Sequence, residues 1–188
     1  MILMTDTGEG QRASVEALKA KLEKQYPGKI DINIIDIFQH APWPLNMFVG
    51  VYNFLAERPP LWKALWHYGR FGPTRELTKE LMNIRWHQRF RGMIQAYRPD
   101  TVVSMHPLGQ EVPLRVLERM GKRKGAGKME VVFVTVVTDP QAAHPTWFHP
   151  NVDAVFVPSE RLATLARKCG LNGDQISRDP LRICPVFL

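Results

Sequence analysis

The chain has 188 residues and a formal charge of +7, from 25 Lys and Arg against 18 Asp and Glu. A 45% share of hydrophobic residues and a 23% share of charged residues are ordinary for a globular protein, and the length suits one compact domain. Two cysteines exclude a disulfide framework and a four-cysteine zinc site, and no run of about 18 apolar residues is present that would span a membrane.

The first segment, Met1 to Met4, is too short for a signal peptide and lacks its basic leader, so it predicts a first β-strand. No transit peptide or other targeting segment is visible, which indicates either a cytosolic protein or one whose leader has been removed. Further apolar runs typical of strands that are covered on both faces follow at 30–38, 101–105, 131–137 and 154–157.

Helical patterns separate most of these strands. Apolar residues at spacings of three and four predict helices over 14–25 and 108–120, and Ser159 is a suitable N-cap for a helix through Lys168 that Gly170 ends. Alternating strands and helices with buried strands predict an α/β fold, a Rossmann-like, doubly wound parallel sheet with right-handed crossovers.

The connection over about 39–98 is too long for a simple crossover, and helical patterns near 46–56, 60–68 and 74–97 indicate a helical insertion. Between Arg58 and Arg98 lie nine basic and two acidic residues, so this stretch holds the whole net charge. The connection over about 39–98 as a whole contains four of the five tryptophans. Aromatic and basic residues on such helices suit an anionic membrane surface. The alternative is a helical core with a solvated basic face. Nucleic-acid binding is not expected, because no recognised reading motif is present.

A glycine-containing loop, Thr5 to Ser14, follows the first strand and opens the first helix. Free N–H groups at a helix start attract anions, and Gly8, Gly10 and Ala13 match the spacing of a dinucleotide fold, with Asp36 as a possible ribose partner. A purely structural turn is the alternative.

Two more loops carry polar residues after the third and fourth strands, where open α/β sheets bind ligands. They contain His106, Asp139, His144 and His149, which suit metal ligands, a general-base pair or a polar rim. We expect no metal, because the spacing of His144 and His149 fits no standard zinc motif. The tail from Asn172 holds turn residues and then an apolar run to Leu188 that resembles a lead into a further segment.

Several segments, taken in order, resemble the monogalactosyldiacylglycerol synthase family, which is similar to bacterial diacylglycerol glucosyltransferases and to the peptidoglycan glycosyltransferase MurG. The resemblance extends from Met1 to about Phe187. The segments are Thr5-Asp6-Thr7-Gly8-x-Gly10-x-Arg12-Ala13-Ser14, Pro42-Trp43-Pro44-x-Asn46, Tyr52-Asn53-Phe54-Leu55, Pro60-Leu61-Trp62-Lys63, His106-Pro107-Leu108-x-Gln110-x-Val112-Pro113-Leu114-Arg115 and Val137-Thr138-Asp139-x5-Pro145-Thr146-Trp147-Phe148-His149.

This resemblance implies the amino-terminal, acceptor-binding domain, residues 1–188, of an inverting glycosyltransferase of the two-Rossmann-domain (GT-B) type. Galactose would pass from UDP-galactose to diacylglycerol at the plastid (chloroplast) envelope, with no cofactor and with an anionic phospholipid such as phosphatidylglycerol as activator. The nucleotide-sugar domain would lie in a missing carboxyl-terminal half. The residues implied for acceptor or lipid binding are Gly8, Gly10, Arg12, Pro42, Trp43, Pro44, His106, Trp147 and His149.

The chain departs from the family at one position that the resemblance implies is catalytic. The family's loop reads Gly-Gly-Gly-His-Arg-Ala-Ser, with histidine as the candidate base, whereas Gln11 stands at that place here, and an amide accepts no proton near pH 7. Either Asp6, Asp139 or His144 acts as base, or the chain is a non-catalytic lipid-binding relic. A dinucleotide-binding oxidoreductase is the more distant alternative. We expect the isolated domain to be inactive.

Overall fold

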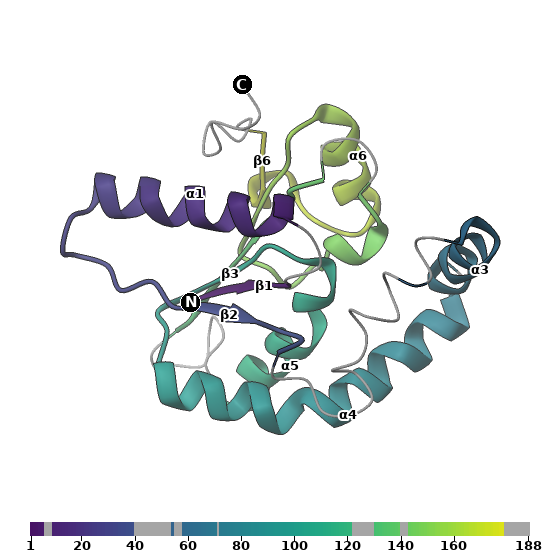
Figure 1. Cartoon of the computed structure of the whole chain (residues 1–188), viewed down its shortest axis with the longest axis horizontal. Helices are drawn as coiled ribbons and strands as arrows, with labels where there is room; N and C mark the ends of the chain where they lie inside the picture. The colour runs from purple at the N-terminus through teal and green to yellow at the C-terminus, as the bar shows by residue number, and fades with distance from the viewer. Residues whose placement is uncertain are drawn as a thin grey trace.

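Six parallel strands form one continuous sheet in the order β2-β1-β3-β4-β5-β6 (Figure 1). The fold is that of a computed structural model, which describes residues 1–5, 9–39, 54, 58–70, 72–121, 130–139 and 143–178. The strands are β1 (Ile2–Met4), β2 (Ile34–Asp36), β3 (Thr101–Ser104), β4 (Val132–Val136), β5 (Ala154–Phe156) and β6 (Ile176–Ser177). The predicted α/β class with a doubly wound parallel sheet is therefore confirmed.

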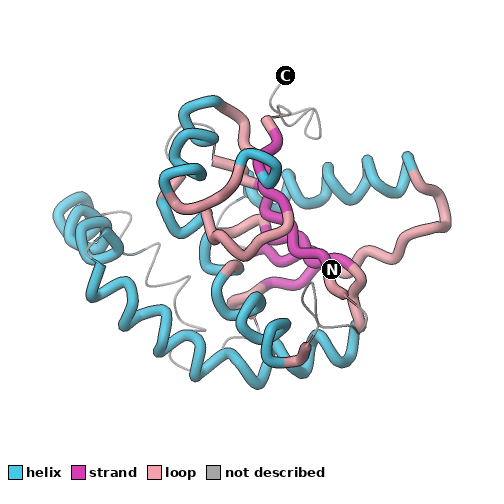
Figure 2. Tube along the Cα trace, turned by 180° about the vertical axis from the view of Figure 1, so that it is seen from behind, coloured by secondary structure: helices cyan, strands magenta, loops and turns pink. Residues whose placement is uncertain are grey.

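Helices cover both faces of this sheet, as the alternation of side chains along β1 requires. Ile2 and Met4 pack with Val15 of α1 (Glu9–Gln25) on one face. Leu3 points to the other face, where α4 (Gly72–Tyr97), α5 (Glu111–Arg119) and α6 (Glu160–Lys168) lie. Figure 2 shows the strands from behind, between α1 and the α4–α5 pair.

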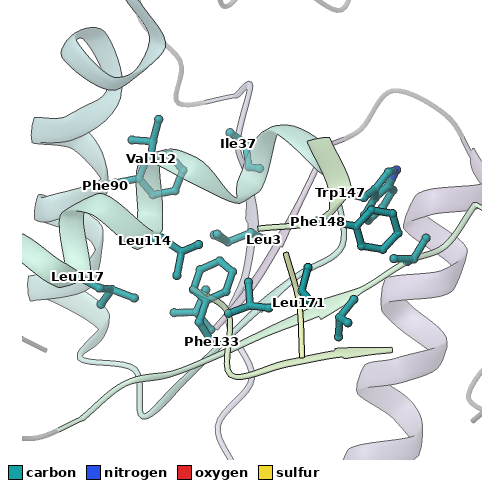
Figure 3. Packing of buried hydrophobic residues seen from close by; sticks show 14 of the residues in the cluster. Leu3, Ile37, Phe90, Val112, Leu114, Leu117, Phe133, Trp147, Phe148 and Leu171 are labelled. Atoms are coloured by element: carbon teal, nitrogen blue, oxygen red, sulfur yellow. The ribbon is translucent and has the colours of Figure 1, made fainter. Parts of the chain in front are cut away.

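The larger core lies on the α4–α5–α6 face (Figure 3). Leu3, Phe133 and Leu114 are fully buried there, and each contributes about 1.5–3 kcal/mol to the free energy of unfolding by its removal from water. This core fixes α5 against the centre of the sheet, and α5 begins at the edge where the strands end.

The second half of α4 belongs to this core. Trp86, Phe90 and Ile94 lie four residues apart on one side of the helix and are 0–2% exposed, whereas Arg89 and Arg91 between them are exposed. Trp86 contacts Phe90 edge to face, with ring centroids 6.2 Å apart. These two aromatic residues of the basic stretch are therefore structural.

The other described helix of the connection, α3 (Pro59–Arg70), stands away from the sheet at the far end of α4 (Figure 1). Between β2 and β3 the described residues outside these two helices are Ile37 to Gln39, Phe54, Arg58 and Arg98 to Asp100. No helix in the described ranges is both long and apolar enough to cross a bilayer.

Three elements start at least three residues away from the position that the sequence predicts. The strand predicted over 30–38 pairs only at Ile34–Asp36, because the residues before it form a turn and an extended segment. The first helix begins at Glu9 rather than at Ser14, and the helix predicted from Leu108 begins at Glu111 after a 3-10 turn, Pro107–Gly109. β6, two residues long, was not predicted, because it carries no apolar run.

The predicted ends of α6 are confirmed. Ser159 Oγ accepts a hydrogen bond from Leu162 N at 3.4 Å, which satisfies one of the amide groups that a helix start leaves without a partner. Gly170 has φ +95°, a left-handed conformation that glycine adopts without strain and that ends the helix.

Candidate functional site

The carboxyl ends of β1, β3 and β4 lie side by side at one edge of the sheet. The chain leaves β1 toward β2 on one side and leaves β3 toward β4 on the other, so the point between β1 and β3 is a topological switch point. Gln11, His106 and Asp139 each follow one of these three strands. The edge where ligand binding is expected therefore carries polar side chains from three separate segments.

The start of α1 is fixed to the end of β1 by a side-chain contact. The buried Thr5 hydroxyl donates to Gln11 Oε1 at 2.9 Å, so the Gln11 amide, at the position of the predicted base, takes part in a structural hydrogen bond. Ser14 Oγ donates to the Gly10 carbonyl at 2.8 Å. Arg12 is exposed and forms an ion pair with Glu16 at 3.4 Å on the helix surface.

Asp36, considered above as a ribose partner, has a structural contact at the end of β2. Its Oδ1 accepts hydrogen bonds from Phe38 N at 2.8 Å and from Gln39 N at 3.3 Å. This is the turn-forming contact that a short acidic side chain makes with the backbone two residues on.

All three candidate histidines form the same local turn. Each precedes a proline, and each Nδ1 accepts a hydrogen bond from the backbone N–H two residues later, because proline fixes φ and offers no N–H of its own. The pairs are His106 with Leu108 (3.2 Å), His144 with Thr146 (3.3 Å) and His149 with Asn151 (3.1 Å). In a neutral ring with Nδ1 as acceptor the hydrogen is on Nε2, so each Nε2 is a donor. The sequence signal for this arrangement, His-Pro-x, occurs three times.

His106 is uncharged at neutral pH in the folded protein, because burial lowers its pKa to about 3. Its ring lies edge-on to Phe38, with centroids 6.1 Å apart. His106 therefore offers a neutral N–H donor at the carboxyl edge of β3.

A buried amide, which the sequence analysis did not single out, fixes this loop. Gln110 Nε2 donates to Ser104 Oγ at 3.2 Å, and Gln110 Oε1 accepts from the Thr135 hydroxyl at 2.8 Å. All three side chains are buried, and Ser104 Oγ also donates to the His106 carbonyl at 3.1 Å. The network joins β3, β4 and the His106 loop. Its one sequence signal is Gln110 itself, within the His106 motif.

Helix α5 also holds the crossover between β4 and β5. Glu111 Oε2 lies 3.3 Å from His149 Nε2, and Glu111 Oε1 accepts from Arg115 Nε at 2.6 Å. The hydrogen bond from His149 is the largest of the effects that lower the pKa of Glu111 to about 2, and Arg115 adds to it. Two turns further along α5, Glu118 Oε1 accepts from Asn151 Nδ2 at 2.8 Å.

A pocket of about 540 Å³ lies between three segments, 107–112, 145–150 and 168–169. It brings the His106 and His149 motifs together, since Leu108 and His149 both line it. Trp147 does not line it: this side chain is 4% exposed and packs in the main core beside Phe148 (Figure 3).

Other predicted residues lie elsewhere. Asp139 follows β4 and is half-buried, and His144 precedes the 3-10 turn Pro145–Trp147. Asp6, Gly8, Pro42, Trp43 and Pro44 lie outside the described residues. Among the residues that the structure describes, no three His, Cys, Asp or Glu side chains come together as a metal-ligand set.

Comparison with known proteins gives one consistent answer. The family profile described as "Monogalactosyldiacylglycerol (MGDG) synthase" matches residues 11–178. The chain is 38% identical to "Monogalactosyldiacylglycerol synthase, chloroplastic" of Spinacia oleracea, with 100% of this chain and 35% of the relative covered. It is 37% identical to "Monogalactosyldiacylglycerol synthase 1, chloroplastic" of Arabidopsis thaliana, with 100% of this chain and 34% of that relative covered. The chain thus spans about a third of the length of these relatives, and the matched part is their amino-terminal part.

Proposed function

Because the chain belongs to the monogalactosyldiacylglycerol synthase family, we propose that it is the acceptor-binding part of a glycosyltransferase that moves galactose from UDP-galactose to diacylglycerol. The observation that carries this proposal is the family match, which extends over nearly the whole chain. The relatives are named chloroplastic, which supports our further proposal that the protein is a peripheral membrane component of the plastid envelope.

In this proposal residues 1–188 form one Rossmann-like domain with the helical insertion over about 39–98. The nucleotide-sugar domain belongs to the part of the relatives that this chain does not cover. This division of the two substrates between two domains suits the position of the candidate site. The acceptor would bind at the carboxyl edge of this sheet and face the nucleotide sugar that the other domain holds. The dinucleotide-oxidoreductase alternative has no support from the family match, and Asp36 forms a turn.

The reaction needs a base, since a neutral hydroxyl becomes a good nucleophile only as its proton is removed. Gln11 cannot fill this role, and His144 Nδ1 already accepts a hydrogen bond from Thr146 N at 3.3 Å. The Asp139 carboxylate, which follows β4 at the same edge, has the acceptor oxygens that a base requires. We therefore assign the proton transfer to Asp139, with Asp6, which follows β1 in the sequence, as the alternative.

A non-catalytic lipid-binding protein is the second candidate. The observation that favours it is the Thr5–Gln11 hydrogen bond, which gives Gln11 a structural contact at the place of the family's histidine. In this alternative the fold and the acceptor surface persist without transfer activity.

A chimaera in which this chain replaces the matching amino-terminal third of the spinach relative tests both candidates. We expect galactose transfer from UDP-galactose to diacylglycerol in detergent–phosphatidylglycerol micelles, with less transfer from UDP-glucose. Asp139→Asn should lower kcat by about 10²–10⁴-fold, the usual contribution of a general base. The matched control is Asp174→Asn. Asp174 is an exposed carboxylate on the η4 turn (Gly173–Gln175), and its change should leave kcat unaltered.

The Gln11→His change separates the remaining outcomes. Transfer that appears only in Gln11→His shows that the acceptor site is intact and the base is lost, as in the second candidate. No transfer in either chimaera, with the native spinach protein active in parallel, contradicts the proposed function.

We also propose that the α3 end of the molecule contacts the membrane. Phe54 and Leu61 are large apolar side chains that are 52% and 43% exposed. The Arg58 guanidinium carbon lies 3.6 Å from the centre of the Phe54 ring, and Arg58 Nη1 donates to the Phe54 carbonyl at 2.9 Å. An exposed aromatic ring beneath a cation suits the interface of an anionic bilayer.

Liposome flotation tests this contact. The double change Phe54→Ser and Leu61→Ser should release the chain from vesicles that contain phosphatidylglycerol, and added salt should weaken binding because exposed charges are screened. Tyr26→Ser is the control, because Tyr26 is 45% exposed just beyond the end of α1, at the opposite end of the molecule (Figure 1). Equal binding to neutral and anionic vesicles would contradict the electrostatic part.

A further inference from the structure

Three directed hydrogen bonds lead from the middle of the sheet to the loop that follows β3. The Thr135 hydroxyl on β4 donates to Gln110 Oε1 at 2.8 Å, and Gln110 Nε2 donates to Ser104 Oγ at 3.2 Å. Ser104 Oγ donates in turn to the His106 carbonyl at 3.1 Å, and Gln110 Nε2 lies 3.5 Å from the same carbonyl. Each hydroxyl has one defined acceptor, so this Gln110 network fixes the direction of the His106 carbonyl.

The Gln110 network lies in the protein interior, where polar groups are costly. Thr135 and Ser104 are 0% exposed, and Gln110 is 2% exposed. Apolar side chains of similar size would fill the same space without any need for partners, whereas a buried polar group costs free energy unless it is hydrogen-bonded. The last acceptor of the network belongs to the His106 loop at the carboxyl edge of the sheet. The network therefore determines the conformation of a loop at the edge where ligands are expected.

This loop is seated closely on the sheet. A Cβ at Gly109 would lie 2.7 Å from Ser104 Oγ and 3.0 Å from Ile37 Cδ1, so glycine is the residue that allows the approach. The His106 ring is held within the same turn, because its Nδ1 accepts a hydrogen bond from Leu108 N at 3.2 Å. The backbone of the loop and the histidine ring are therefore fixed together.

One polar atom of the loop is left for a ligand. With Nδ1 as acceptor, the hydrogen of the neutral ring is on Nε2, and no group of the described residues accepts it. The buried polar atoms without a partner in the described part of the chain are Trp86 Nε1 and His87 Nε2, so His106 Nε2 still reaches solvent. The pKa of His106 is lowered to about 3 by burial, and a ring that is neutral at pH 7 suits the uncharged oxygens of a diacylglycerol.

We propose that Gln110 is a positioning residue for the acceptor. Through Ser104 it holds the His106 loop so that His106 Nε2–H donates to an oxygen of the diacylglycerol. Gln110 acts through His106, because both ends of its amide are bonded within the protein. The proposal rests on the function proposed above.

The kinetics of the chimaera described above test this role. Gln110→Met keeps the length of the side chain but forms none of these hydrogen bonds. The KM for diacylglycerol should rise about tenfold, the equivalent of one lost hydrogen bond, and the KM for UDP-galactose should not change. Ser104→Ala should have a smaller effect, because Gln110 Nε2 is still close to the His106 carbonyl. An unchanged KM for diacylglycerol, or an equal rise in both KM values, would overturn the proposal.

A control variant separates positioning from a loss of stability. Leu162→Ala removes a side chain of α6 that is 2% exposed and takes no part in the Gln110 network. Thermal unfolding should show that both variants are destabilised. Leu162→Ala should lower the rate only as far as the folded fraction falls, with both KM values unchanged. The positioning role would be wrong if Leu162→Ala raised the KM for diacylglycerol as much as Gln110→Met does.

Combination with His106→Ala tests whether Gln110 acts through His106. His106→Ala removes the donor and should raise the KM for diacylglycerol about tenfold by itself. Adding Gln110→Met to that variant should raise the KM no further, although the loss of stability from Gln110→Met should remain. Two effects that multiply in the double variant would show that Gln110 acts independently of His106.

The histidine ring tests the positioning role even when the chimaera is inactive, an outcome that contradicts the proposed function. In nitrogen-15 NMR spectra of the 188-residue chain, the parent should show His106 with its hydrogen on Nε2. Gln110→Met should give a mixture of the two tautomers, because the released loop no longer keeps Leu108 N against Nδ1. With an inactive chimaera, an unchanged tautomer in Gln110→Met would overturn the positioning role.

Discussion

Glu111 and His149 join the first turn of α5 to the crossover between β4 and β5, with Glu111 Oε2 3.3 Å from His149 Nε2. The Glu111 side chain is only 17% exposed, so water replaces this contact poorly when it is lost. A hydrogen bond to a charged group contributes roughly 1.5–3 kcal/mol to the free energy of unfolding.

Glu111→Gln should therefore lower the free energy of unfolding by about 2 kcal/mol at pH 7, measured by urea denaturation. The pKa of Glu111 is lowered to about 2 in the folded state, so its contribution is present above about pH 4.5 and is lost as the pH falls toward 2. The difference between the parent and Glu111→Gln should shrink over that range. Glu118→Gln is the matched control on the same helix and should cost less than about 1 kcal/mol, and a larger loss from Glu118→Gln than from Glu111→Gln would contradict this ranking.

His106 should make the protein sensitive to mild acid. Its folded-state pKa of about 3 is below its ordinary value, so below about pH 6.5 the unfolded chain binds a proton that the folded chain does not. The free energy of unfolding should fall by about 2 kcal/mol between pH 7 and pH 5 from this residue alone. His106→Asn keeps a side-chain acceptor for Leu108 N and does not titrate, so its stability should fall less over the same range. Identical pH profiles for the parent and His106→Asn would contradict the assignment.

The Gln110 network should behave as a unit. Gln110→Leu leaves the buried hydroxyls of Ser104 and Thr135 without the amide, and should cost about 2–3 kcal/mol in the free energy of unfolding. Adding Ser104→Ala and Thr135→Val removes the unsatisfied groups and should recover part of that loss. Thermal unfolding of the single, double and triple variants measures this coupling, and strictly additive losses would show that the three side chains act independently.

Two glycines should respond in opposite directions to the same substitution. A Cβ at Gly109 would lie 2.7 Å from Ser104 Oγ and 3.0 Å from Ile37 Cδ1, so Gly109→Ala should destabilise the protein by about 1–3 kcal/mol. A Cβ at Gly92, on the exposed side of α4, meets no atom within 4 Å. Gly92→Ala should therefore stabilise the protein by about 0.5–1 kcal/mol, because alanine is the better helix former. Urea denaturation measures both, and a stabilising Gly109→Ala would mean that the close approach at Gly109 relaxes.

The sequence by itself determined the class of the fold, because the information for it is local. The apolar run Ile2-Leu3-Met4 has the pattern of a strand covered on both faces, and both faces are covered in the structure. Ser159 and Gly170 mark the ends of α6 with side-chain and backbone properties that act within one turn. The family, too, could be identified from the sequence, since the motifs that carry the resemblance are short and ordered.

Only the tertiary structure decided how the site residues are connected. Ile30 and Ile32 have the composition of a strand, yet pairing with β1 begins at Ile34 because register is set by the partner strand. The contact of Gln110 with Thr135 spans 25 positions, and that of Glu118 with Asn151 spans 33. Neither has a local pattern. Packing also decided the surroundings of two further residues. Trp147, which the family resemblance implies for acceptor binding, is 4% exposed in the core, and Lys168 comes from the end of another helix to the pocket wall.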